Sequence, residues 1–185
     1  MSVKTCSFFG HRKIEITDKL KQKVKEVVEN LIVNHNVLTF LFGSRSNFDD
    51  LCFEIVSELK EEKYPSIKRI SYTCKSEGCF LEKDKQKWEE FYSRIEKREV
   101  HMLCFDEEYE HKTKYTAGKA SYVERNQAMI NYSDYCIFYY DENYKPPPRK
   151  YSKRSVCEYQ PKSGTALAFA HAKQKKKFLI NLSEI

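Results

Sequence analysis

Residues 37–59, VLTFLFGSRSNFDDLCFEIVSEL, contain the pattern that decides the fold. The first six are almost continuously apolar, which is typical of a strand covered on both faces, and the run stops at Gly43. Beyond it, apolar residues recur at helical spacing and predict an amphipathic helix, with Ser46 or Asn47 as its cap. A buried strand followed by such a helix is the repeating unit of a parallel α/β sheet.

The same alternation occurs on both sides of this unit. Thr5 to Phe9 predicts a short buried strand, and apolar residues from Leu20 to Ile32 predict the next helix, which Thr17 or Asp18 caps. Ile67 to Thr73 predicts a third strand. Three strands separated by two helices imply right-handed crossovers and a parallel sheet, which is half of a Rossmann-like fold.

The second half of the chain resumes this alternation after an interruption. Residues 75–118 are expected to form a helical insertion, with a charged helix at Trp88 and a short strand at Met102 to Phe105. Residues 141–162 predict a long, basic, proline-rich loop. The other segments predict a helix at Tyr122–Tyr132, a strand at Tyr135–Tyr140, a helix at Ser163–Lys173 and a strand at Lys177–Leu182. We therefore expect a single α/β, three-layer Rossmann-like domain over residues 1–185, with a mostly parallel sheet.

The composition favours a folded protein with anionic partners. Hydrophobic residues make up 41% of the 185 residues, which is enough for a core and excludes a disordered tail. The 33 Lys and Arg residues exceed the 27 Asp and Glu residues, and the net charge of +6 suits small anions as well as nucleic acid.

The cysteines and the apolar runs indicate the cellular compartment of the protein. The seven cysteines are odd in number and scattered, so we expect reduced thiols and a cytoplasmic protein. No apolar run has the length of a signal peptide or a membrane span, so no membrane partner is expected. Cys74 and Cys79 lack a second Cys or His pair at zinc spacing, so we expect neither a metal nor another cofactor.

Glycine is scarce, and three of the five glycines lie where a ligand is expected. Ligands of open parallel sheets bind beyond the carboxyl ends of the strands, where the winding reverses. Gly10 and Gly43 end strands there and Gly164 opens a helix, so backbone amides can approach a phosphate, although the glycines also suit tight turns. Hydroxyls and basic groups that suit phosphate or carboxylate follow or flank these glycines: His11, Arg12, Ser44, Arg45, Ser163 and Thr165.

Arg125 and Asn126 are polar residues on the helix predicted before a buried strand. In one interpretation Arg125 projects toward the strand ends as an anion clamp. In the other, it pairs with Glu124 or Asp134 on the surface, where an ion pair contributes little.

Four further residues allow both a functional and a structural interpretation. Asp49 either places a carboxylate near the ligand or forms a capping box with Ser46. His11 either orients a ribose or phosphate or packs against the neighbouring loop. Tyr139 and Tyr140 end a strand, where one ring can stack on a base unless both belong to the core.

Four motifs together resemble the YpsA-like branch of the SLOG superfamily, which is related to the lonely-guy phosphoribohydrolases and the DNA-processing protein DprA. The motifs are CSFFGHR (6–12), FGSRSNFD (42–49), YVERNQAMINYSDYCIFYY (122–140) and SGTALAFAHAKQKKKFLINL (163–182). The resemblance implies a nucleotide or nucleotide-derived ligand that contacts four places: Gly10-His11-Arg12, the loop at Gly43, Arg125-Asn126 and Ser163-Gly164-Thr165. It also implies a homodimer or larger assembly and a role in bacterial stress or defence.

One departure from the related enzymes concerns catalysis. The phosphoribohydrolases carry a Gly-Gly-x-Gly-Thr-x-x-Glu signature, and the position of its glutamate is Ala168 in this chain. A methyl group cannot protonate a leaving base, so we expect binding, sensing or sequestration of the ligand rather than its cleavage. The first alternative is an N-glycosidase that uses Asp49 or Glu124, and the second is a protein that binds single-stranded DNA.

Overall fold

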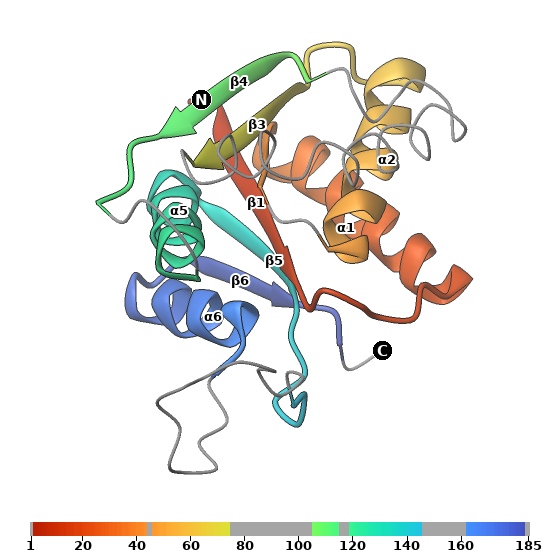
Figure 1. The fold of residues 1–185 in the computed structure, drawn as a ribbon. Helices are drawn as coiled ribbons and strands as arrows, with labels where there is room; N and C mark the ends of the chain where they lie inside the picture. The colour runs from red at the N-terminus through yellow and green to blue at the C-terminus, as the bar shows by residue number, and fades with distance from the viewer. Residues whose placement is uncertain (1, 44–45, 75–104, 115–118, 146–161, 184–185) are drawn as a thin grey trace, which may run out of the picture.

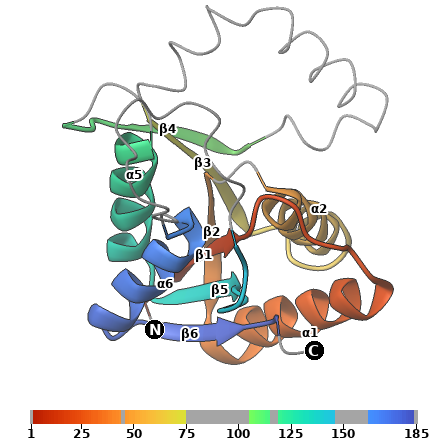
Figure 2. The same ribbon diagram turned by 60° about the horizontal axis from the view of Figure 1, so that its bottom comes forward.

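The computed structural model describes residues 2–43, 46–74, 105–114, 119–145 and 162–183. Within these ranges, six strands form one sheet, and helices cover both of its faces (Figure 1). Helices α1 (Asp18–His35) and α2 (Asn47–Glu62) lie on one side, and α5 (Lys119–Tyr132) and α6 (Gly164–Gln174) on the other (Figures 1 and 2). This is the three-layer α/β arrangement of a Rossmann-like fold.

The strand order β4-β3-β2-β1-β5-β6 identifies the place where the winding reverses. From β1 the chain adds strands on one side as far as β4, and it then crosses to the opposite side of β1 for β5 and β6. All five pairings are parallel, so the carboxyl ends of the strands share one edge, and the switch point lies between β1 and β5. The strands are β1 (Lys4–Gly10), β2 (Val37–Phe42), β3 (Lys68–Cys74), β4 (Glu107–His111), β5 (Tyr135–Tyr139) and β6 (Phe178–Asn181).

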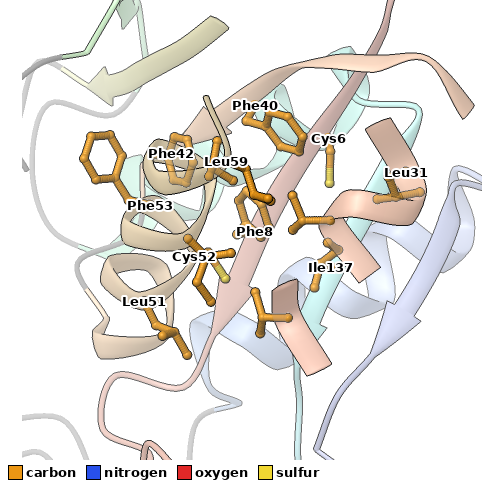
Figure 3. Close-up of a cluster of buried hydrophobic side chains, with 14 of the residues drawn as sticks. Cys6, Phe8, Leu31, Phe40, Phe42, Leu51, Cys52, Phe53, Leu59 and Ile137 are labelled. Atoms are coloured by element: carbon orange, nitrogen blue, oxygen red, sulfur yellow. The ribbon is translucent and has the colours of Figure 1, made fainter. Parts of the chain in front are cut away.

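Successive side chains of β1 point to opposite faces of the sheet and join the core on either side of it. Phe8 is fully buried on the α1 and α2 side, where its ring stacks on Phe40 at 6.0 Å and on Phe42 at 5.1 Å. Figure 3 shows these rings of the sheet together with side chains such as Cys52 and Leu59 of α2. Phe9 belongs to the cluster on the α5 and α6 side, so each face of β1 contributes to a different half of the core.

Serine and threonine side chains begin three of the helices. The Thr17 hydroxyl accepts a hydrogen bond from the Leu20 amide at the start of α1, and Ser46 serves α2 in the same way through the Asp49 amide. The sequence left Thr17 or Asp18, and Ser46 or Asn47, as the two caps, and the structure selects the first of each pair.

The prediction for residues 75–118 is partly wrong. Phe105, the last residue of the predicted strand, precedes the strand, which is β4 at residues 107–111. Its sequence, Glu-Glu-Tyr-Glu-His, lacks an apolar period because β4 is an edge strand whose first four side chains are exposed. The Trp88 helix, Cys79 and most of the basic loop lie outside the described residues.

A charged network attaches the start of β4 to β3 and α2. The Asp106 carboxylate accepts hydrogen bonds from the Arg69 amide at 2.8 Å, the Arg69 Nε at 3.2 Å and the Lys60 Nζ at 2.6 Å. Burial alone would raise the pKa of Asp106, but the hydrogen bonds from Arg69 and Lys60 outweigh it and lower the pKa to about 2. The Asp106 carboxylate is therefore a pH-sensitive element of the fold.

Candidate ligand-binding site

Gly10, the last residue of β1, lies against the first turns of two helices, α2 and α6. A Cβ atom at Gly10 would lie 2.5 to 2.7 Å from three atoms of Phe48, so the glycine allows the first turn of α2 to pack directly on the strand. From the other side, the Thr165 hydroxyl of α6 donates a hydrogen bond to the Gly10 carbonyl oxygen at 2.9 Å. Two helix N-termini, which favour anions, therefore flank the end of β1.

The three residues at the start of α6 have different roles. The Ser163 hydroxyl accepts a hydrogen bond from the Ala166 amide at 3.0 Å, and Thr165 is bonded to Gly10, so both hydroxyls support the fold. A Cβ atom at Gly164 would meet nothing within 4 Å. Packing against the described residues therefore gives no reason for a glycine here, and the space beside the first turn of α6 is open toward them.

His11 follows β1 and bridges the switch point to the end of β5. Its ring is 2% exposed, its Nε2 lies 3.0 Å from the Asp141 amide nitrogen, and the ring stacks on Tyr144 at 3.9 Å. Burial lowers the pKa of His11, although the carbonyl and charge of Asp141 partly oppose this, and a neutral Nε2 can accept the amide hydrogen. His11 packs against the distant segment after β5 rather than against the neighbouring loop, and a role toward a ligand stays a prediction.

The His11 Nδ1 atom is unusual. It is buried and has no hydrogen-bond partner in the described part of the chain. When Nε2 accepts the Asp141 amide hydrogen, the proton of the neutral ring resides on Nδ1, so a buried donor is left unpaired. Buried polar groups without a hydrogen-bond partner are rare in folded proteins.

Arg125 lies beside Gly43, at the end of β2. Its side chain is 4% exposed, and its Nε would be 3.3 Å from a Cβ atom placed at Gly43. The Nε and Nη2 atoms donate to the Asn126 Oδ1 at 3.3 and 3.2 Å, and the guanidinium lies 5.5 Å from the centre of the Tyr122 ring. Arg125 is therefore buried beside the end of β2 and is not exposed on the surface, and its role as an anion clamp stays a prediction.

The two candidate catalytic carboxylates lie in different surroundings. Asp49 is 5% exposed in the first turn of α2, where its amide donates to the Ser46 hydroxyl at 3.2 Å as expected for a cap. Both Glu124 oxygens accept a hydrogen bond from the Lys114 amide, at 3.1 and 2.9 Å, so Glu124 anchors the segment after β4. Ala168 is 2% exposed in the core cluster that contains Phe9. Catalysis by Asp49 or Glu124 stays a prediction.

The described cysteines do not add a nucleophile to the site. Cys6, Cys52, Cys74 and Cys136 are all buried and unbridged. Burial raises the pKa of Cys6 and Cys52 well above the usual value and that of Cys136 to about 11, so these thiols stay protonated near neutral pH.

The structure gathers most of the predicted site residues at two neighbouring strand ends. Gly10, His11, Ser163, Gly164 and Thr165 lie around the end of β1, and Gly43, Arg125 and Asn126 lie around the end of β2. Adjacent strands are about 4.8 Å apart, so the two groups are neighbours along the carboxyl edge of the sheet. Glu124 contacts Lys114 instead, Arg12 is exposed, and Ser44 and Arg45 lie outside the described residues.

Sequence reasoning missed a cleft of about 780 Å³ beside α6. One wall is the outer face of α6, and the other is the segment Tyr140–Lys145 that follows β5. Tyr140 stacks on Phe169 at 4.5 Å, which shows that Tyr140 belongs to this wall, while Tyr139 packs against the core on the α1 and α2 side. The aromatic end of the YCIFYY motif was the available signal, but the motif alone does not reveal its distant partners.

The fold and the site together define a Rossmann-like α/β protein with an anion-favouring edge at its switch point. The family model described as "YspA SLOG family" matches residues 6–175, and the chain belongs to this family. The membership confirms the resemblance of the four motifs and suggests a nucleotide-related function, either binding or catalysis. None of the curated proteins compared with the chain matches it. Within the described ranges, no helix has both the length and the apolar character needed to cross a bilayer.

Proposed function

We propose that this protein binds a nucleotide or a nucleotide-derived ligand at the carboxyl edge of its sheet and thereby senses or sequesters it. The observation that carries the proposal is the buried Arg125 guanidinium beside Gly43, one strand away from the place where α2 and α6 begin. Membership of a SLOG family supports the nucleotide class.

The chemistry of this edge suits a phosphate group. A guanidinium presents several N–H donors in a planar fork that matches phosphate oxygens, and its interaction is stronger where water is excluded. The open space at Gly164 would let a phosphate approach the first amides of α6, where the helix dipole favours negative charge. The exposed Arg12 guanidinium, which follows β1, would neutralise further charge.

Calorimetric titration with a panel of nucleotides tests the proposal. Arg125→Ala removes a charge-assisted contact and is expected to cost about 2 kcal/mol of binding free energy, which is roughly a 30-fold loss of affinity. Lys4→Ala is the matched control, because it removes one positive charge from the opposite, amino-terminal end of β1. Unchanged affinity in a folded Arg125→Ala protein would refute the role of Arg125.

The same panel separates binding from the two alternatives. Chromatography of the incubated nucleotides detects free base, and turnover that Asp49→Asn abolishes would replace the binding proposal with N-glycosidic cleavage. A steep fall of affinity for single-stranded DNA with increasing salt would favour the nucleic-acid alternative. The proposal also includes a cytoplasmic homodimer or larger assembly with a role in bacterial stress or defence, and light scattering tests its oligomeric state.

A further inference from the structure

One wall of the cleft beside α6 is a single face of that helix. Its lining residues Ser163, Ala166, Phe169, Ala170 and Lys173 recur every three or four positions, so they form one stripe along the helix. At about 1.5 Å per residue, this stripe is about 15 Å long. It begins at the helix N-terminus that the proposed phosphate site uses, so the cleft extends that site sideways along α6.

Tyr144 forms the opposite wall as a supported aromatic ring. One face of the ring stacks on His11 at 3.9 Å and 20° between the planes, and the 2% exposed His11 is itself fixed by the Asp141 amide. In the described part of the chain, His11 is the only ring that contacts Tyr144 near enough to stack. Tyr144 also lines the cleft, and a ring held on one face in this way loses little freedom when a flat molecule stacks on its other face.

The charges around the cleft favour an anion. Lys145, Lys162 and Lys173 line it, and the Lys173 Nζ lies 4.8 Å from the centre of the Phe169 ring. Two carboxylates, Asp141 and Glu142, also line the cleft, so the lysines outnumber them by one. The Asp141 carboxylate accepts a hydrogen bond from the Asn143 amide at 2.8 Å within its own turn. A flat ring that carries phosphate meets both the aromatic and the basic groups of this cleft.

We propose that the cleft holds the base of the bound nucleotide, with Tyr144 as the stacking surface and His11 as the residue that positions it. This inference rests on the proposed function, and it narrows the ligand class to molecules that contain a nucleobase and not merely a phosphorylated sugar. Stacking tolerates different bases, so the cleft selects for a flat ring before it selects among bases.

Titration with ribose 5-phosphate and with the four ribonucleoside monophosphates tests this directly, because the two kinds of probe differ by the base. At least one nucleotide is expected to bind about tenfold or more tightly than ribose 5-phosphate, which is the effect of one base on an aromatic ring. Tyr144→Ala should abolish this difference, and Tyr144→Phe should keep it. Tyr132→Ala is the matched control, because Tyr132 is 71% exposed and lies at the far end of α5.

A second variant tests the cleft without removing any contact of the fold. Ala170 is exposed and lines the cleft, so Ala170→Trp fills the space where the base would lie. This change should weaken nucleotide binding by about tenfold or more, as the loss of one stacked base would, and leave ribose 5-phosphate binding unchanged. Circular dichroism of both variants establishes that they are folded.

The outcomes separate this inference from the proposed function. If the nucleotide advantage persists in both Tyr144→Ala and Ala170→Trp, the base does not occupy the cleft. If nucleotides and ribose 5-phosphate bind equally and both depend on Arg125, the inference is wrong and the strand-end site stands. If nucleotide binding depends on Tyr144 but not on Arg125, the cleft stands and the strand-end site is wrong. If no probe binds, both are overturned.

Discussion

Replacement of Gly10 by alanine is expected to destabilise the protein although it adds only one methyl group. The new Cβ atom would lie 2.5 Å from the Phe48 Cβ, 2.6 Å from its Cδ1 and 2.7 Å from its Cγ. Phe48 is fully buried in the first turn of α2, so it can move away only if the helix moves with it. Inserting a methylene-sized group into a well-packed core costs about 1 to 3 kcal/mol.

For a chain of this length, about 1 kcal/mol corresponds to a shift of about 2 to 4 °C in the melting temperature, so Gly10→Ala should lower it by about 2 to 12 °C. Differential scanning calorimetry measures the shift. Gly164→Ala is the matched control, because its Cβ atom would meet nothing within 4 Å and alanine restricts the unfolded chain; it should leave the melting temperature unchanged or raise it slightly. Equal melting temperatures of wild type and Gly10→Ala would refute the packing explanation.

Three further predictions concern pH and the link between α6 and β1. The pKa of Asp106 is lowered from 3.8 to about 2, so its carboxylate stabilises the fold above about pH 4. This contribution, up to about 2 kcal/mol, is lost as the pH falls toward 2. Asp106→Asn should therefore flatten this part of an acid-unfolding curve followed by circular dichroism. Burial lowers the pKa of His11 below 6.5, so protonation of His11 favours the unfolded chain. The midpoint of urea unfolding should therefore fall as the pH decreases from above 6.5, and it should fall less in His11→Phe. Thr165→Val leaves the Gly10 carbonyl without its hydroxyl donor and should cost about 1 to 2 kcal/mol in urea unfolding, whereas Thr165→Ser should restore most of it.

The elements with a strong apolar period were predictable from the sequence. Val37–Phe42 was predicted as a strand with the bounds that the structure has, and Thr17 and Ser46 were among the predicted caps. These predictions depend on local physics, namely the side-chain period of a buried element and the hydroxyl that accepts the first helical amides. Strand β4 was not predicted because an exposed edge strand needs no apolar face.

The site was predictable only in outline. Three glycines were expected to expose their backbone to a ligand: Gly10, Gly43 and Gly164. Packing explains two of them, because a Cβ atom at Gly10 would clash with Phe48 and one at Gly43 would lie 2.6 Å from the Tyr72 carbonyl oxygen. Of these three described glycines, Gly164 alone has open space beside it. The partner of His11 lies 130 residues further along the chain, a contact that no local pattern encodes.

The most direct test of the account is mass spectrometry of small molecules released by denaturing freshly purified protein, wild type and Arg125→Ala in parallel. The account predicts that the wild type releases a phosphate-bearing molecule with a nucleobase and that the variant releases much less of it. Equal amounts from both proteins, or a released molecule that lacks phosphate, would contradict the assignment of the strand-end site.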